Sequence, residues 1–194
     1  MKRKMRNKEG QPSTNNFDIY LRGMWKIILK NKIAGCTFIY TLWFKNYMSN
    51  TCNSRTDALR WISNEKVFEK RYVFIPMCEG GHWNLLILCN LDKTVDSKTR
   101  PCLLLLDSLQ STISDKHKAG LQTFVKNIYK EDGRVGAEAV VKYPFGIPKV
   151  PQQTDGSKCG QYVLYYIYKF LMCCPQNYNW EEDYPGFVSG LQII

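Results

Sequence analysis

The sequence predicts an α+β domain built around a central sheet. Three strand signals lie close together, YVFIPM at 72–77, WNLLILCNL at 83–91 and CLLLLDSL at 102–109. SDKHKAGLQTFVKNIYKEDG at 114–133 then repeats its apolar residues at helical spacing, and residues 161–172 are apolar nearly all round, as in a buried helix. A sheet accompanied by helices in this way is an α+β arrangement.

The chain has 194 residues, of which 44% are hydrophobic, enough for one domain with a sizeable core. Residues 1–17 contain almost no apolar residues, so we predict a disordered basic tail there, with structure beginning near Tyr20 and a folded domain over 18–194. The stretch MKRKMRNK fits a nuclear-import or nucleic-acid patch, and equally a solvated tail. No zinc-finger, basic-zipper or RNA-recognition signature accompanies it, so nucleic-acid binding is not expected.

The composition also limits which cellular compartments and which cofactors are expected. No uncharged apolar run of about 18 residues is present and no secretory signal is visible, so we expect no membrane span and a location in the nucleus or cytoplasm. In such a compartment most of the eight cysteines should be free thiols within the core. With no C-x-x-C pair and only two histidines, neither a zinc site nor another cofactor is expected. We expect a monomer.

The first third of the chain should be mainly helical. Residues 24–48 are apolar and rich in aromatic residues, which predicts one or two short helices interrupted around Gly35. TCNSRTD at 51–57 is interpreted as a loop, and Asp57 could cap a helix over 58–68.

The remaining elements follow from turn and capping residues. CEGGH at 78–82 suits a hairpin between the first two strands. Ser114 can cap the amphipathic helix and Gly133 can end it. EAVVKY at 138–143 is a further strand candidate, and an extended, proline-rich approach over 144–158 leads to Cys159.

Cys159 lies where a polar loop meets the buried helix, and it could be a core thiol, a metal ligand or a nucleophile. A thiol at a helix N-terminus is close to unsatisfied backbone N–H groups, which favour the thiolate. Lys158 adds a neighbouring positive charge, and Gly160 leaves room for a substrate backbone to approach the sulfur.

A nucleophilic cysteine needs a base and a group that orients the base. His117 lies between two lysines on the exposed side of its helix and is interpreted as a solvated residue. His82, at the mouth of a strand, can face a cleft while the strand holds it rigid. Asp107 ends the leucine run, where a buried acid needs a partner, although an aspartate at a strand end is also common. Bonded to Nδ1–H of His82, it would fix the tautomer.

An oxyanion intermediate also needs a hydrogen-bond donor. Gln153 stands six residues before Cys159, and its side-chain amide could form an oxyanion hole with the backbone N–H of Cys159. Gln152 is the immediate competitor, and either glutamine could be an ordinary loop residue.

Together, GHWNLLIL, LLLLDSL and Q-x-x-x-x-x-CG resemble the SUMO-specific cysteine proteases, the ubiquitin-like-protein-processing family of the adenain-like clan. The order His, Asp, Gln, Cys is that of the family, and the motifs are most similar to plant members. The resemblance implies a papain-like/adenain-like fold, with a central mixed sheet and the nucleophile at the N-terminus of a buried helix. It runs from about Cys36 to Leu171.

The resemblance also implies a role for each site residue. Cys159 would attack the carbonyl after a C-terminal Gly-Gly, His82 would act as base and then acid, Asp107 would orient it and Gln153 would stabilise the oxyanion. Trp83 matches the tryptophan that roofs a narrow diglycine tunnel. The partner implied is a ubiquitin-like modifier, SUMO or NEDD8, with its conjugates.

Three features depart from the family pattern. Lys158 replaces an acidic residue that usually precedes the cysteine, and we expect it to lower the thiol pKa. The interval from His82 to Asp107 is longer than usual. The early W-L-x-D segment, whose tryptophan forms the other tunnel wall, has no good match, and Trp25 is only a candidate. Alternatives are therefore a binding module with weak or no activity, a deneddylase, or an acetyltransferase that uses the same residues.

Overall fold

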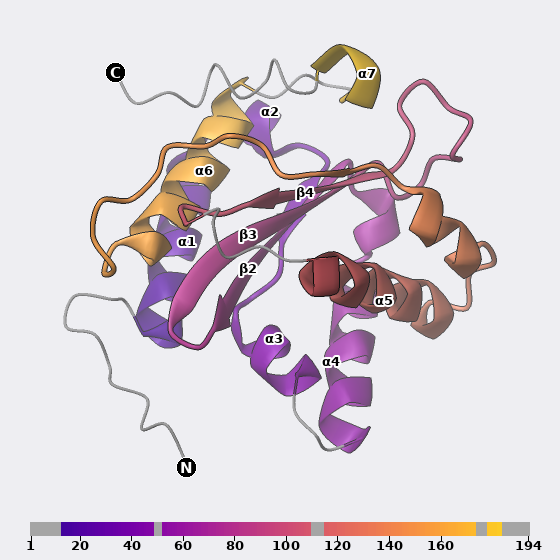
Figure 1. The fold of residues 1–194 in the computed structure, drawn as a ribbon, viewed down its shortest axis with the longest axis horizontal. Helices are drawn as coiled ribbons and strands as arrows, with labels where there is room; N and C mark the ends of the chain where they lie inside the picture. Colours follow the sequence, from indigo (N-terminus) through magenta and orange to yellow (C-terminus); the bar gives the residue numbers. More distant parts are fainter. Residues whose placement is uncertain (1–12, 49–51, 110–114, 174–177, 184–194) are drawn as a thin grey trace.

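The fold is a mixed five-stranded sheet with helices on both faces (Figure 1). The structure is a computed structural model and describes residues 13–48, 52–109, 115–173 and 178–183. The α+β prediction is confirmed. The strands, in sheet order, are β1 (Cys36–Phe38), β2 (Tyr72–Glu79), β3 (His82–Cys89), β4 (Cys102–Leu106) and β5 (Phe145–Gly146). The α-helices are α1 (Thr14–Ile27), α2 (Lys30–Ile33), α3 (Leu42–Tyr47), α4 (Cys52–Asn64), α5 (Asp115–Glu131), α6 (Cys159–Cys173) and α7 (Trp180–Asp183).

The three predicted central strands are confirmed as β2, β3 and β4, joined in antiparallel order. The predicted hairpin between β2 and β3 turns at Gly80 and Gly81, whose φ angles of +59° and +82° are ones that glycine adopts without strain. The two short outer strands pair in parallel, β1 with β2 and β5 with β4, which makes the sheet mixed.

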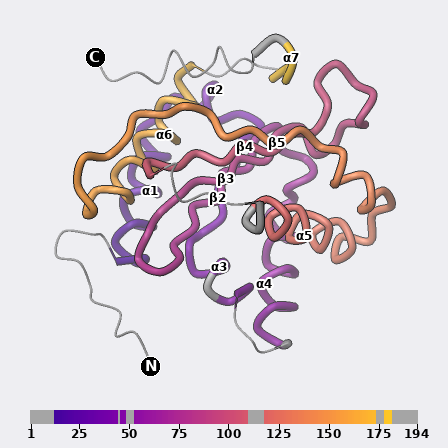
Figure 2. Tube along the Cα trace, viewed as in Figure 1, coloured from indigo at the N-terminus to yellow at the C-terminus, as the bar shows by residue number. Residues whose placement is uncertain are grey.

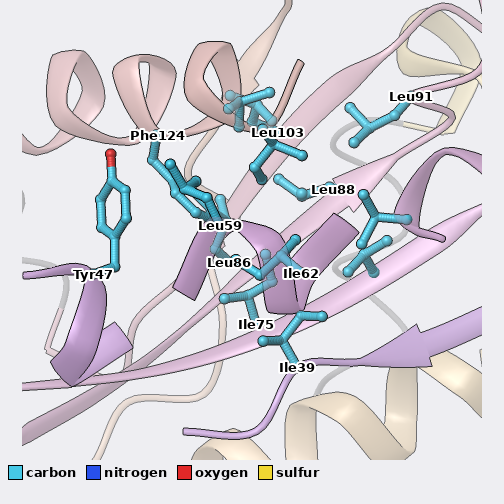
Figure 3. Packing of buried hydrophobic residues seen from close by; sticks show 14 of the residues in the cluster. Ile39, Tyr47, Leu59, Ile62, Ile75, Leu86, Leu88, Leu91, Leu103 and Phe124 are labelled. Atoms are coloured by element: carbon cyan, nitrogen blue, oxygen red, sulfur yellow. The ribbon is translucent and has the colours of Figure 1, made fainter. Parts of the chain in front are cut away.

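Alternate residues of the central strands supply two hydrophobic clusters. Leu85 and Ile87 of β3 pack with α1 and α6, whereas Leu86 and Leu88 point to the cluster formed with α3, α4 and α5. Figure 3 shows this second cluster, in which Phe124 of α5 lies near Leu59 of α4 and Leu86 of the sheet. Because side chains alternate across a strand, a run of leucines serves both faces at once.

The predicted amphipathic helix 114–133 is confirmed as α5, and the predicted buried helix as α6. Ser114, the predicted cap of α5, lies outside the described residues. Gly133 follows α5 with φ +66°, as a helix-ending glycine does. Figure 2 shows the extended segment that runs from β5 back along the edge of the sheet to the start of α6. That segment carries the two candidate glutamines past the end of β4.

The first helix begins earlier than the sequence indicated. We predicted disorder through residue 17, but α1 starts at Thr14, and the side-chain oxygen of Ser13 accepts a hydrogen bond of 3.3 Å from the backbone N–H of Asn16. Phe17 is fully buried against the ring of Trp83, with 4.2 Å between the ring centroids. One apolar residue in a polar segment shows no periodicity, so only its tertiary partner reveals its burial.

Three further elements differ from the predictions. Residues 52–57, interpreted as a loop, form the first turns of α4, with Asp57 inside the helix and 3.7 Å from Arg60. Residues 138–143 were predicted as a strand, but Ala137–Lys142 form a 3₁₀ helix. Its buried Ala137 and Val140 are three residues apart, which is the 3₁₀ period, whereas the paired valines favoured a strand. Strand β1 lies in the region predicted as helical.

Candidate active site

His82 and Asp107 meet at adjoining ends of two neighbouring strands. His82 is the first residue of β3, and Asp107 follows the last residue of β4. Extending the β3–β4 register by one step places Asp107 opposite Asn84, so His82 is its diagonal neighbour on the same face. Nε2 of His82 lies 2.7 Å from Oδ1 of Asp107, whose side chain is 1% exposed. Oδ1 also accepts the backbone N–H of Leu109 at 2.7 Å.

The ring nitrogen that binds Asp107 differs from the one predicted. We expected Nδ1–H to donate to the carboxylate, but the contact is made by Nε2. The diagonal approach across the strands reaches the far nitrogen of the ring, which leaves Nδ1 as the nitrogen available to the thiol. As predicted, one ring nitrogen of His82 bonds to the carboxylate and the other is left for the thiol.

Cys159 is the first residue of α6 and is fully buried beside His82. Its sulfur accepts the backbone N–H of Trp83 at 3.4 Å and forms a side-chain hydrogen bond with His82. The backbone N–H of Gly160 in the first turn of α6 also bonds to the sulfur. These donors surround the position where a thiolate charge would lie.

The electrostatics of the two groups are coupled. The hydrogen bond to Asp107, followed by that to Cys159, raises the pKa of His82 to about 9, although burial acts in the opposite direction. Burial by itself would raise the pKa of the Cys159 thiol, yet the hydrogen bonds from His82 and from Trp83 N–H outweigh it and lower this pKa. The arrangement therefore favours a thiolate–imidazolium pair.

The candidate oxyanion residue is buried beside Ser108, which follows Asp107. Gln153 is 8% exposed, and its Oε1 accepts the hydroxyl of Ser108 at 2.7 Å. Its Nε2 donates to the carbonyl of Asp155 at 2.5 Å, and its backbone N–H donates to the carbonyl of Ser108 at 3.1 Å. The amide is thus held by the residue that follows Asp107.

Gln152 has a different environment. Its Nε2 donates to the carbonyls of Asp107, at 3.1 Å, and Val150, at 2.9 Å, and the residue is exposed. An amide nitrogen has two donor hydrogens, and these two bonds use both. Gln152 therefore connects its loop to the end of β4.

The chain matches a known protein family. Residues 29–187, most of the chain, match the Ulp1 protease family, C-terminal catalytic domain. The chain belongs to the Ulp1 protease family. The predicted resemblance to this family is confirmed.

Known relatives of this Ulp1-family chain are larger proteins. It is 28% identical over 177 residues to the probable ubiquitin-like-specific protease 2A of Arabidopsis thaliana, covering 78% of the chain and 22% of that protein. The chain thus spans about a fifth of that relative's length.

Solved structures support the fold. A de-sumoylating protease superposes with a TM-score of 0.58 at 24% identity, covering 80% of this chain and 59% of that one. The C-terminal Ulp1 protease domain in complex with Smt3, the yeast ortholog of SUMO, superposes with a TM-score of 0.62 at 15% identity, covering 93% and 74%. The predicted mixed sheet with the cysteine at the start of a buried helix is confirmed as the family fold.

Lys158 acts differently from the prediction. Its Nζ lies 3.0 Å from Oδ2 of Asp155, three residues earlier. Hydrogen bonds from Ser157, together with Lys158, lower the pKa of Asp155 to about 2. The ammonium is thus engaged within its own loop, and the hydrogen bonds of His82, Trp83 and Gly160 lower the thiol pKa in this Ulp1-family chain.

Trp83 contributes its backbone N–H to the sulfur, and its side chain is 1% exposed. The indole stacks on Phe17 with an interplanar angle of 14°. At a centroid separation of 4.2 Å, the two rings are in contact, so no peptide backbone fits between them. A diglycine tunnel under Trp83, as the family resemblance implies, stays a prediction and would have to use another side of the ring.

The sequence did not identify two residues of this region. Ser108 positions the Gln153 amide, and its place immediately after Asp107 was the available signal. Phe17 covers Trp83 but had no local signal. The side chain of His117 lies outside the described residues. Among the described residues, no cluster of three or more His, Cys, Asp or Glu side chains could hold a metal ion.

Proposed function

We propose that this chain is a cysteine protease and isopeptidase that cleaves after the C-terminal Gly-Gly of a ubiquitin-like modifier, with SUMO as the first choice. The observation that carries the proposal is the convergence of His82, Asp107 and Cys159, with 2.7 Å between the histidine and the carboxylate and a lowered thiol pKa. Membership of the Ulp1 family supports the same chemistry.

In this mechanism the thiolate of Cys159 attacks the carbonyl carbon of the terminal glycine. The carbonyl oxygen takes up negative charge, which the backbone N–H of Cys159 and the side-chain amide of Gln153 stabilise. Gln153 suits this role because its bond to Asp155 uses one of the two amide hydrogens. The protonated His82 then gives its proton to the leaving amine, and the C–N bond breaks to leave a thioester on Cys159.

Hydrolysis of the thioester completes the reaction. His82, now neutral, takes a proton from water as the water attacks the acyl carbon, and the thiolate leaves. Asp107 orients the ring and stabilises its charge in both halves of the cycle. The buried position of the carboxylate, 1% exposed, keeps this interaction strong because little water screens it.

The choice of modifier rests on the relatives. One is named a ubiquitin-like-specific protease, and one solved structure holds Smt3. SUMO is thus the first modifier to test, with NEDD8 and ubiquitin beside it. An exclusive reaction with NEDD8 would make the chain a deneddylase.

The decisive experiment uses modifier proteins that carry a C-terminal electrophile. SUMO, NEDD8 and ubiquitin probes are incubated with the wild-type chain and with Cys159→Ala, and adducts are measured by intact-mass spectrometry. We expect a SUMO adduct on Cys159 and none in the variant. Binding of SUMO without an adduct would indicate a non-catalytic module, and transfer from acetyl coenzyme A would indicate an acetyltransferase.

A further inference from the structure

A cavity of about 400 Å³ lies on the sheet face opposite α1 and α6. It is bounded by α3, α5 and the adjoining ends of β2, β3 and β4. Its walls are mostly apolar and include the aromatic rings of Trp43, Tyr47 and Phe124 and the side chain of Leu105 of β4. This volume lies within the usual range of small-molecule sites, which combine apolar walls with a few polar groups.

Two buried polar atoms of this cavity have no hydrogen-bond partner among the residues the structure describes. They are Nε1 of Trp43, a donor, and Oδ1 of Asn84, an acceptor. Buried polar groups are nearly always paired, because an unpaired one loses its bonds to water without replacement. Both atoms have almost no accessible surface, so they add polarity to the wall of the cavity but do not open into it.

The charge of the cavity selects the kind of polar group. Glu79, at the rim, is the one charged side chain among the described lining residues. A carboxylate accepts hydrogen bonds, and aromatic faces attract cations. An apolar molecule with a protonated amine matches these features, whereas a carboxylate would meet Glu79 with the same charge.

The cavity also contacts the strand ends that hold the catalytic pair. Glu79 pairs directly with His82 in the β2–β3 ladder, and Asn84 is two residues beyond His82. Leu105 is two residues before Asp107 on β4. A molecule in the cavity therefore touches both strands within two residues of the histidine and the carboxylate.

We propose that this cavity is a binding site for a small aromatic amine, and that its occupancy alters the reactivity of Cys159 through His82. Binding itself does not depend on the proposed protease function. The apolar body packs against the aromatic residues of α3 and α5, and the ammonium lies toward Glu79.

The first test measures binding of 3-phenylpropylamine to the ¹⁵N-labelled chain by NMR. We expect the indole N–H resonance of Trp43, assigned with Trp43→Phe, to shift with saturation at a ligand concentration on the order of 1 mM, reasonable for ten non-hydrogen atoms. The neutral 3-phenylpropan-1-ol is the matched ligand. Glu79→Gln should weaken the amine about two- to five-fold, as for an exposed ion pair, and leave the alcohol unchanged.

Gly120 offers a matched pair of variants. It lines the cavity on α5, and a Cβ there would meet nothing within 4 Å. Gly120→Leu should therefore fill the mouth of the cavity and abolish binding. Gly120→Ala adds the same gain in helix propensity without filling it, so it should bind normally.

The second test follows the rate at which iodoacetamide alkylates Cys159. Saturating 3-phenylpropylamine should change this rate at least two-fold in wild type and Gly120→Ala, and leave it unchanged in Gly120→Leu. An unchanged wild-type rate overturns the coupling to His82. Two results would overturn the proposed site. One is the absence of a Trp43 shift, as expected if another part of the chain fills the cavity. The other is equal binding of the amine by Gly120→Leu. If the binding and alkylation results are as expected but the chain does not cleave a modifier, only the proposed protease function is contradicted.

Discussion

Nε2 of His82 lies 2.7 Å from Oδ1 of Asp107, across the ends of two antiparallel strands. This contact is the leading cause that raises the pKa of His82 to about 9. The histidine is therefore protonated at neutral pH while the neighbouring thiol has a lowered pKa. One buried carboxylate thus influences both groups.

Asp107→Asn tests this relationship. The amide keeps the size of the carboxylate but removes its charge, so the imidazolium loses its stabilisation and the tautomer is no longer fixed. We expect kcat/KM on a fluorogenic modifier substrate to fall by roughly 10²- to 10⁴-fold. The Kd for the modifier, measured with Cys159→Ala in the background, should stay within about two-fold. Unchanged turnover would remove Asp107 from the mechanism.

The source of the lowered thiol pKa can be found by alkylation. Iodoacetamide reacts with the thiolate, so the pH dependence of Cys159 labelling, read by peptide mass spectrometry, reports the thiol pKa. We expect His82→Gln to move the profile to higher pH and Lys158→Gln to leave it in place, because Lys158 pairs with Asp155. Exposed Cys173 serves as the internal control. A large shift in Lys158→Gln would restore the direct role first expected for that lysine.

The pH profile of turnover should follow the same two groups. Activity rises with pH as Cys159 loses its proton, at a pH below the ordinary thiol range because its pKa is lowered. It falls as His82 loses its proton around pH 9, because the leaving amine then has no acid. Asp107→Asn should move the falling limb to lower pH. A wild-type profile that declines near pH 6.5 would contradict the raised histidine pKa.

Gln153→Ala should slow acylation by roughly 10²-fold or more if its amide stabilises the oxyanion. Single-turnover kinetics isolates this step, and urea unfolding of the variant separates catalytic loss from instability. Gln152→Ala is the matched neighbour, and we expect a much smaller effect because its amide bonds two backbone carbonyls. An effect confined to Gln152 would transfer the role to that residue.

Phe17→Ala should destabilise the domain by about 3–5 kcal/mol, because a fully buried ring stacked on Trp83 is replaced by a cavity. Ile19→Ala on the same helix is the control, since Ile19 is 65% exposed and should change the free energy of unfolding by less than about 1 kcal/mol. Urea denaturation measures both. Similar stability of the two variants would mean that α1 does not pack on Trp83 in solution.

The central strands and the two long helices could be predicted because their signals are local. Four consecutive leucines at 103–106, and apolar residues at helical spacing in α5, carry enough information by themselves. The 3₁₀ helix at 137–142 could not, since its paired valines favour a strand in isolation and only the packing of Ala137 and Val140 decides otherwise.

The candidate site, too, could be predicted only in part from the sequence. Chemical identity and order along the chain singled out His82, Asp107 and Cys159, and the structure brings these three together. The sequence could not determine which ring nitrogen meets the carboxylate, because that depends on the strand register. Nor could it show that Lys158 pairs with Asp155, because both Asp155 and Cys159 are within reach of a flexible lysine.

By itself, therefore, the sequence determined the α+β class, the strand and helix that carry the reactive groups, and the groups themselves. Only the tertiary structure showed that α1 begins at Thr14 and covers Trp83. It also determined which hydrogen-bond partner each polar side chain has. The physical reason is that periodicity and residue chemistry are properties of neighbouring residues, whereas burial and hydrogen-bond partners depend on residues far apart in the chain.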